Sequence, residues 1–250
     1  TELPLTLSSP PVYYNTAMVA AIKDQENRTL QGFNQEAWAF ANIKNRKTQW
    51  SVIAQQIVLN QLIEESGSTP DLDLDAWDGY TAARRRFINT IKQNNIDNVV
   101  VLSGDSHANW VYDGLLPDDL PKYDQATGKG SSFVEFAGTA VSSSSSYGRN
   151  LTQAAYDMHS RALVNANKNL AFAEGAKRGY FELTVTKKKV SAEYLAVANV
   201  FDPNSGVTSL ATFEVKDKAN RLTRPLNGGK PPASGAIMGQ ALPAKKRFEA

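Results

Sequence analysis

A short apolar segment that ends in a glycine, a carboxylate and an imidazole constrains this chain more than any other feature. The segment reads Asn98-Val99-Val100-Val101-Leu102-Ser103-Gly104-Asp105-Ser106-His107-Ala108-Asn109. Its four consecutive apolar residues, three of them β-branched, predict a buried strand. Asp105 and His107 then follow at the carboxyl end of that strand, which is where open α/β sheets bind ligands. Because an Asp-x-His pair offers one oxygen and one nitrogen ligand, the segment indicates a metal site.

A turn without metal is the alternative for the same residues, since Asp at the end of a strand commonly forms turns. The scarcity of histidine favours the metal hypothesis, because the chain has only two, His107 and His159. His159 falls on a predicted helix, where a structural role is the simpler interpretation. Asn109, two residues beyond His107, either contacts a phosphate or forms a turn.

The composition excludes several classes of function. The 250 residues are 42% apolar and 21% charged, as in an ordinary globular protein, and the net charge of +2 gives no general attraction to nucleic acid. There is no cysteine, which excludes disulfides, zinc-thiolate sites and cysteine nucleophiles. No stretch approaches the roughly 18 apolar residues of a membrane span. Three local basic clusters, beginning at Arg84, Lys187 and Lys245, are interpreted as solvated faces.

Periodicity predicts alternating helices and strands in the first two thirds of the chain. Asn34 could cap a helix with Ala37, Trp38, Ala41 and Ile43 at helical spacing. The other expected elements are a strand at 50–54, a helix through Ile57, Val58 and Leu62, an amphipathic helix at 81–93 with its three arginines mostly off the apolar face, strands at 99–102 and 133–137, and a helix from about 151. The step from helix 81–93 to strand 99–102 is half of a repeating α/β unit.

The last third of the chain changes from helical to strand periodicity. Residues 180–186 and 190–197 alternate around a lysine turn and predict a β-hairpin, and a further strand is expected at 210–215. Residues 113–129 are expected to form a surface excursion, and the serines at 142–146 form either a linker or a loop that lines the site. We expect residues 1–220 to form one domain and residues 221–250, rich in Pro, Gly and Lys, to form an extended tail.

Several sequence blocks, in order, carry a resemblance to a known family. They are Arg28-Thr29-Leu30 with Gly32 and Gln35-Glu36-Ala37-Trp38, Trp50-Ser51-Val52-Ile53-Ala54-Gln55-Gln56, Trp77-Asp78-Gly79-Tyr80 with the arginine-rich helix, Val101 to His107, Val134-Glu135-Phe136, and Arg178-Gly179-Tyr180. Over residues 25–215 the chain resembles the C-terminal half of PhoD-like alkaline phosphatases/phosphodiesterases, a branch of the calcineurin-like metallophosphoesterases.

The resemblance implies an α/β fold, specifically the C-terminal half of a four-layer αββα sandwich. It also implies metal-assisted hydrolysis of phosphate esters, with iron and calcium as the metals and a periplasmic or secreted location. By motif match, Asp105 and His107 are expected to be metal ligands and catalytic residues.

The sequence departs from the family pattern because the earlier ligand segments are missing. Neither the Gly-Asp…Tyr segment nor the Asp-Asp-His-Glu-type segment occurs, and the chain begins with Thr1 rather than Met. We therefore expect the remaining ligands to come from a second polypeptide or a missing N-terminal segment. The alternative is a metal-free α/β module with a binding or structural role.

Four residues are candidates for substrate binding. Asp78 and Tyr80 could shape the substrate pocket, although Asp78 as a helix cap beside a core Trp77 is an equal alternative. Asn109 could contact phosphate, and Arg149 could bind an anionic substrate with two hydrogen bonds. A Ser-His-Asp hydrolase is disfavoured because no Gly-x-Ser-x-Gly turn is present.

Overall fold

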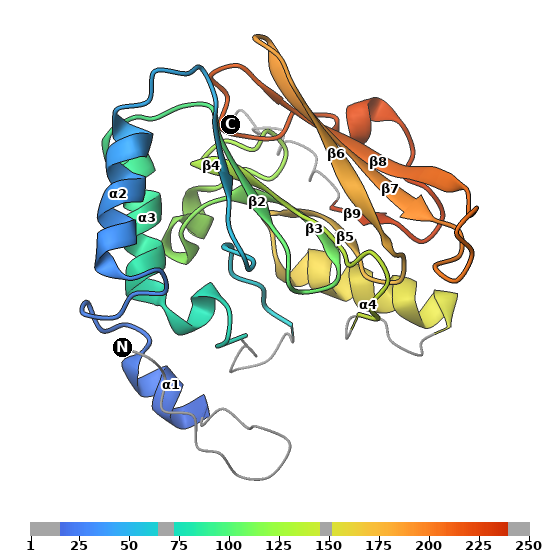
Figure 1. Ribbon diagram of the computed structural model, residues 1–250, viewed down its shortest axis with the longest axis horizontal. Helices are drawn as coiled ribbons and strands as arrows, with labels where there is room; N and C mark the ends of the chain where they lie inside the picture. The colour runs from blue at the N-terminus through green and yellow to red at the C-terminus, as the bar shows by residue number, and fades with distance from the viewer. Residues whose placement is uncertain (1–15, 65–72, 146–151, 240–250) are drawn as a thin grey trace, which may run out of the picture.

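The computed structural model describes residues 16–64, 73–145 and 152–239 (Figure 1). The helices are α1 Thr16–Ile22, α2 Phe33–Lys44, α3 Thr81–Gln93 and α4 Gln153–Ala166, with short 3-10 turns η1 Trp77–Gly79, η2 Pro117–Lys122 and η3 Leu226–Gly229. The strands are β1 Ser51–Ala54, β2 Val99–Ser103, β3 Asn109–Gly114, β4 Phe133–Ala137, β5 Leu170–Glu174, β6 Gly179–Val185, β7 Lys189–Val197, β8 Val207–Lys216 and β9 Ile237–Met238. No helix in these three ranges is long and apolar enough to cross a membrane.

Six strands form a mixed sheet in the order β1-β2-β4-β3-β5-β9. Strand β1 pairs parallel to β2, and β2 pairs parallel to β4. Strand β3 runs antiparallel to both β4 and β5, so β5 points the same way as β4. The carboxyl ends of β1, β2, β4 and β5 therefore meet at one edge of the sheet, where a ligand site is expected.

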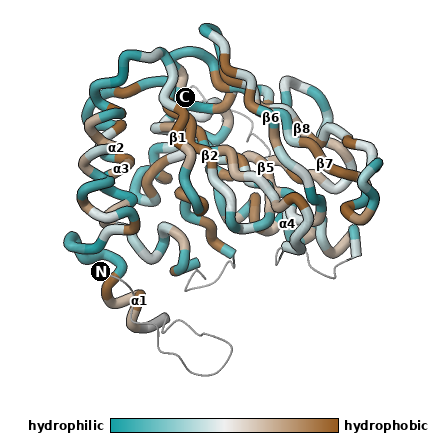
Figure 2. The backbone as a smooth tube through the Cα atoms, viewed as in Figure 1, coloured by the Kyte–Doolittle hydropathy of each residue, from teal (hydrophilic) through white to brown (hydrophobic). Residues whose placement is uncertain are grey.

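A second sheet packs against the first and creates the largest core. Strands β6, β7 and β8 are antiparallel, and their inner face meets the large sheet. Figure 2 shows the hydrophobic segments concentrated in the strands between the layers. The central aromatic contacts join Phe172 of β5 to Tyr194 of β7 and Phe213 of β8, with ring centroids 5.5 and 5.3 Å apart.

The opposite face of the large sheet is covered by helices. Phe87, Ile88 and Ile91 of α3 pack on Val99 and Val101 of β2. Further along the same sheet, α4 packs beside β5 and β9. The described elements thus make three layers, helices, large sheet and small sheet, and the fourth helical layer of an αββα sandwich does not appear among them (Figure 1).

Periodicity correctly predicts the positions of helices α2 and α3 and of strands β1, β2 and β4. Three details of these elements differ from the prediction. Gly32, with φ +82°, precedes α2 in place of an Asn34 cap. Trp38 points to solvent and is 66% exposed. Arg84 is buried instead of lying on a solvated face, because its guanidinium pairs with the Asp78 carboxylate at 2.5 Å.

The predicted helix through Ile57, Val58 and Leu62 is wrong, and the segment is an irregular loop. Its backbone is instead bound by a buried side chain of the sheet: the amides of Leu59 and Asn60 donate to the Glu135 carboxylate at 2.7 and 2.9 Å. These tertiary hydrogen bonds replace the intrahelical ones that the apolar spacing suggested.

The predicted surface excursion at 113–129 starts too early in the sequence, because residues 113 and 114 still belong to a strand. Strand β3 occupies Asn109–Gly114 and is buried along its whole length in the centre of the large sheet. The polar Asp113, the second-last residue of this strand, is buried because Arg224, Tyr123 and the Leu222 amide bind its carboxylate.

The extended tail is likewise corrected for residues 221–239. Leu222 is buried in the core, the Arg224 guanidinium lies 2.7 Å from the Asp113 carboxylate, and Ile237 and Met238 pair with β5. The two alternating segments at 180–197 do pair as β6 and β7, but they belong to a three-stranded sheet with β8. Residues 240–250 lie outside the described ranges.

Candidate functional site

Loops from three parallel strands meet at the carboxyl edge of the large sheet. Strand β2 is followed by Asp105 and His107, β4 by Thr139 and the serine-rich loop 142–145, and β5 by a turn that leads to Arg178. Because β2, β4 and β5 are parallel, side chains more than 30 residues apart in sequence come into contact here.

The backbone of the Asp105–His107 loop is strained. Asp105 has φ +69° and His107 has φ +56°, which places two non-glycine residues in the left-handed region. Asp tolerates this region better than most residues, whereas His does so at a cost. Such a conformation persists only where the surrounding contacts enforce it, and it is concentrated at functional sites.

The imidazole of His107 is held by a backbone carbonyl. Its Nδ1 lies 2.9 Å from the carbonyl oxygen of Ser144. A carbonyl only accepts, so the neutral ring must carry its proton on Nδ1 and leave a lone pair on Nε2. Within the described ranges no other residue hydrogen bonds to that ring, which leaves Nε2 without a partner among them. This arrangement is the one that metal-binding histidines use.

The backbone of His107 is fixed from the other two loops. Its carbonyl accepts from Thr139 Oγ1 at 2.9 Å and from the Arg178 guanidinium at 2.8 Å. Under the loop, Trp110 Nε1 donates to the hydroxyl of Ser106 at 2.9 Å. The loop is therefore a rigid element, although it lies at the surface of the sheet edge.

Asn109 is buried beneath the Asp105–His107 loop and is not presented to solvent. Its side chain is 1% exposed, donates to the Glu174 carboxylate at 3.2 Å and accepts from the Thr139 amide at 3.0 Å. Burial raises the pKa of Glu174, and hydrogen bonds from the Lys177 and Ala176 amides oppose that rise. Asn109 thus connects β3 to the loop after β4, which is a different role from the predicted phosphate contact or turn.

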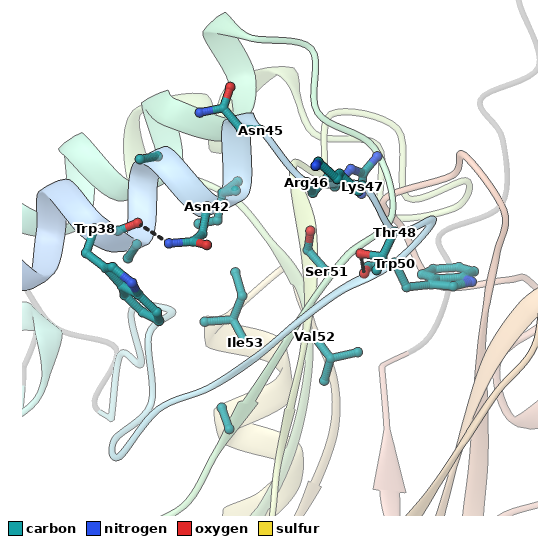
Figure 3. A pocket seen from close by; sticks show the side chains of 14 residues that line it. Trp38, Asn42, Asn45, Arg46, Lys47, Thr48, Trp50, Ser51, Val52 and Ile53 are labelled. Atoms are coloured by element: carbon teal, nitrogen blue, oxygen red, sulfur yellow. Dashed lines mark hydrogen bonds between the residues drawn. The ribbon is translucent and has the colours of Figure 1, made fainter.

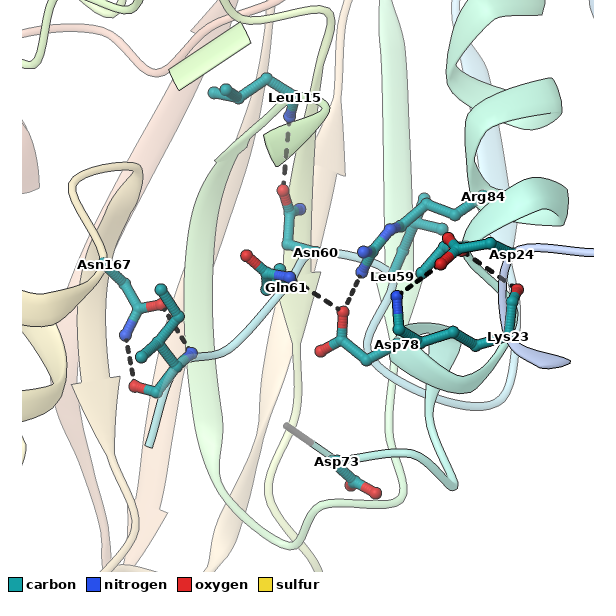
Figure 4. Close-up of polar contacts among 12 residues, drawn as sticks. Lys23, Asp24, Leu59, Asn60, Gln61, Asp73, Asp78, Arg84, Leu115 and Asn167 are labelled. Atoms are coloured by element: carbon teal, nitrogen blue, oxygen red, sulfur yellow. Dashed lines mark hydrogen bonds and ion pairs between the residues drawn. The ribbon is translucent and has the colours of Figure 1, made fainter. Parts of the chain in front are cut away.

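Asp105 faces a different neighbourhood from His107. The exposed Asp105 lines a small cavity of about 20 Å³ together with Asp73 and Asp78. Asp78 is committed to the ion pair with Arg84 (Figure 4), so it does not present a free carboxylate. Burial raises the pKa of Asp73, with the neighbouring Asp75 charge acting in the same direction.

The structure also places two other residues singled out in the sequence, Tyr80 and His159. Tyr80 follows η1 and stacks under the guanidinium of Arg28, whose carbon lies 4.2 Å from the ring centroid. His159 lies on α4. Arg149 lies outside the described residues. The structure therefore groups Asp105, His107 and Asn109, with Asp78 on the neighbouring cavity.

The donor types of Asp105 and His107 suit a metal ion, but they do not complete a site. A carboxylate oxygen and an imidazole nitrogen are ligands for hard and transition-metal cations. Within residues 16–64, 73–145 and 152–239, no group of three or more His, Asp or Glu side chains is arranged to hold a metal. The described residues fit part of a metal site.

A larger groove lies beside the edge strand β1. A groove of about 730 Å³ runs between α2 and the edge strand β1, and Trp38, Ile53 and Val52 point into or over it (Figure 3). Val52 is 42% exposed, and β1 pairs with a neighbour only on its β2 side in the described sheet. The groove is thus an open sheet edge flanked by apolar side chains, and not part of the candidate metal site.

Comparison with known proteins is consistent with this geometry. The family model for PhoD-like phosphatase matches residues 6–194. The chain belongs to the PhoD-like phosphatase family. It is 35% identical over 187 residues to alkaline phosphatase D of Bacillus subtilis (strain 168), covering 75% of this chain and 30% of that protein. It is also similar to a solved structure described as the structure of PhoD, with a TM-score of 0.65 and 30% identity, over 79% of this chain and 35% of that one.

The chain thus spans about a third of the length of the PhoD-like relatives that it matches. The sequence identifies Asp105 and His107 and offers the serine run 142–146 as a possible site-lining loop, but it does not single out the three residues that hold His107: Thr139, Ser144 and Arg178. Two of these act through a single hydroxyl or a main-chain carbonyl, which leave no sequence pattern. For Arg178 a signal existed, since Arg178-Gly179-Tyr180 is one of the blocks that carry the family resemblance.

Proposed function

We propose that this chain is part of a metal-dependent phosphoric ester hydrolase of the alkaline phosphatase/phosphodiesterase type. The observation that carries the proposal is the state of His107: a strained loop at a sheet edge presents an imidazole whose Nδ1 is bound and whose Nε2 is open. Membership of the PhoD-like phosphatase family supports the reaction class.

In this proposal Asp105 supplies a carboxylate oxygen and His107 Nε2 supplies a nitrogen to the metal centre. Iron and calcium are the proposed metals, because imidazole suits a transition metal and carboxylate oxygen suits calcium. A bound metal polarises a phosphoryl oxygen and lowers the pKa of a coordinated water. The protein's own contribution is to keep the two ligands and the loop carbonyls in a fixed arrangement before substrate arrives.

The remaining ligands are proposed to come from a second polypeptide or a further N-terminal segment. The relatives are longer, and two ligating side chains cannot hold a metal cluster alone. The open edge of β1 offers the completing segment a place to add strands to the same sheet. We also propose a periplasmic or secreted location, on family resemblance alone.

The alternative is a binding or structural module on the same fold without metal. The strain at Asp105 and His107 favours the enzyme, because left-handed non-glycine residues are concentrated at functional sites. Elemental analysis of the purified complete protein separates the two proposals, since only the enzyme is expected to retain iron and calcium.

The test uses the chain joined with its completing segment and an aromatic phosphate monoester and diester as substrates. We expect hydrolysis that is lost on chelation and restored by metal. His107→Ala should lower kcat/KM by at least about 100-fold, because loss of a ligand should cost no less than loss of an outer partner. His159→Ala, on α4, is the matched control and should retain activity. Unchanged turnover in His107→Ala would refute the assignment.

A further inference from the structure

The buried guanidinium of Arg178 ties together three loops at the sheet edge. Nη1 donates to the carbonyl of His107 and to the carbonyl of Ser143, each at 2.8 Å. Nη2 donates to the carbonyl of Gly175. These acceptors follow β2, β4 and β5 respectively, so one side chain connects the ends of three strands.

Arg178 is an unusual choice for a purely structural connection. The residue is only 8% exposed, and none of the ion pairs within the described ranges includes its guanidinium. Burial lowers the pKa of Arg178, and the nearby charge of Glu174 offsets part of that effect. A buried cation held by three backbone carbonyls is costly unless its geometry is needed, because partly compensated charges are expensive in the interior.

The geometry links Arg178 to the imidazole of His107 by two routes. The first is direct, since the guanidinium binds the His107 carbonyl and so fixes a residue at φ +56°. The second passes through the serine-rich loop: Arg178 binds the carbonyl of Ser143, and the next carbonyl, that of Ser144, accepts the Nδ1 proton of His107. Both ends of the Nδ1–carbonyl hydrogen bond therefore depend on one side chain.

We propose that Arg178 is a positioning residue that sets the tautomer of His107. By holding the His107 backbone and the serine-rich loop together, it keeps the proton of the neutral ring on Nδ1 and the lone pair of Nε2 directed to a ligand. Free neutral imidazole in a histidine side chain prefers the opposite tautomer, so this arrangement must be imposed by the protein. The proposal rests on the proposed function only in taking a metal ion as the ligand of the Nε2 lone pair.

The test is nitrogen NMR of the assembled, metal-free protein, in which only this chain is labelled with ¹⁵N in its histidines. The chain has two histidines, and His159→Gln assigns the signals of His107. At a pH where the ring is neutral, we expect His107 to show a protonated Nδ1 and an unprotonated Nε2. In Arg178→Met, which keeps the length of the side chain but removes all donors, the two nitrogen shifts should converge or exchange places.

Arg178→Lys is the second test variant, and it keeps the proposal testable if Arg178→Met does not fold. A lysine keeps the positive charge, but its single nitrogen cannot span the carbonyls of His107, Ser143 and Gly175 together. We expect partial averaging of the His107 nitrogen shifts in this variant. Arg161→Met, on the exposed face of α4, is the matched control and should leave them unchanged. A folded Arg178→Lys or Arg178→Met protein that keeps the Nδ1–H tautomer of the wild type would overturn the proposal.

This measurement is independent of catalysis. If the complete protein binds no metal and hydrolyses no phosphate ester, the proposed function fails while the tautomer result can still stand. If hydrolysis is present but the wild-type His107 carries its proton on Nε2, the positioning role fails while the proposed function stands.

Discussion

The left-handed conformation of Asp105 and His107 is unfavourable for non-glycine residues, so surrounding contacts must stabilise it. The conformation of Asp105 and His107 costs of the order of 1–3 kcal/mol at each position. Anchors on both sides offset that cost: the Gly104 amide donates to the Gln56 carbonyl at 3.1 Å, and Arg178 holds His107. Asp105 itself is exposed, so its side chain contributes little packing and its identity is open to ligand chemistry.

Substitutions at Asp105 separate backbone strain from charge. Asp105→Asn keeps a residue that tolerates positive φ, so its free energy of unfolding should stay within about 0.5 kcal/mol of the wild type while metal retention falls. Asp105→Val places a β-branched residue at φ +69° and should lower the free energy of unfolding by about 1–3 kcal/mol. Urea denaturation of the metal-free proteins measures both. Equal stability of the two variants would show that the loop relaxes freely.

At the scale of elements, strand β4 organises the loops around it through Glu135. This residue is fully buried, and its carboxylate accepts from the amides of Leu59 and Asn60 and from the hydroxyl of Ser103. It therefore fixes both the irregular segment after β1 and the end of β2 from which the site loop departs. Burial raises the pKa of Glu135, and these hydrogen bonds act against the rise.

Glu135→Ala should lower the free energy of unfolding by about 3–5 kcal/mol, because it leaves buried amides without an acceptor and opens a cavity. Glu182→Ala, at an exposed position of β6, is the control and should change it by less than about 0.5 kcal/mol. Since the folded pKa of Glu135 is raised, its protonation stabilises the fold at low pH, and this contribution is lost as the pH rises through the folded pKa. The difference between wild type and Glu135→Ala should therefore narrow with rising pH, and a widening difference would contradict the sign.

Elements with strong local patterns were predictable, and those defined by tertiary contacts were not. Helix α3 and strands β2, β4 and β7 follow clear periodicities. Strand β3 was missed because its polar Asn109 and Asp113 look like loop residues until Glu174 and Arg224 are seen to bind them. The false helix at 57–62 has apolar spacing but gives its backbone hydrogen bonds to Glu135.

The candidate site follows the same rule. Its position at the end of β2 is as the strand pattern predicts, because the direction of a parallel strand fixes where its loop lies. The partners of His107 come from 32, 37 and 71 residues away, and all three contacts use a backbone carbonyl as the acceptor. The register of the sheet decides which backbone carbonyl each donor reaches, and residue types alone do not reveal that register.

At the scale of the whole molecule, the edge of β1 that is open among the described strands and the incomplete set of metal ligands among the described residues point to a larger assembly. The chain matches only about a third of its relatives' length, and an open strand edge beside apolar side chains is an aggregation hazard. We predict that residues 1–250 are not an autonomous monomer and share an interface above the roughly 2,000 Å² of obligate contacts. Size-exclusion chromatography and native mass spectrometry of native material decide the matter, and a well-behaved 27.3 kDa monomer would contradict the prediction.

Because Trp38 is exposed, its intrinsic fluorescence can report on that assembly. The chain has four tryptophans; Trp50, Trp77 and Trp110 are at most 9% exposed, whereas Trp38 is 66% exposed beside the β1 groove. Red-shifted emission and acrylamide quenching should therefore come almost entirely from Trp38, and Trp38→Phe should abolish both. When a segment covers the groove, the emission should move to the blue and quenching should fall, so occupancy of the β1 edge can be followed by fluorescence, without a label.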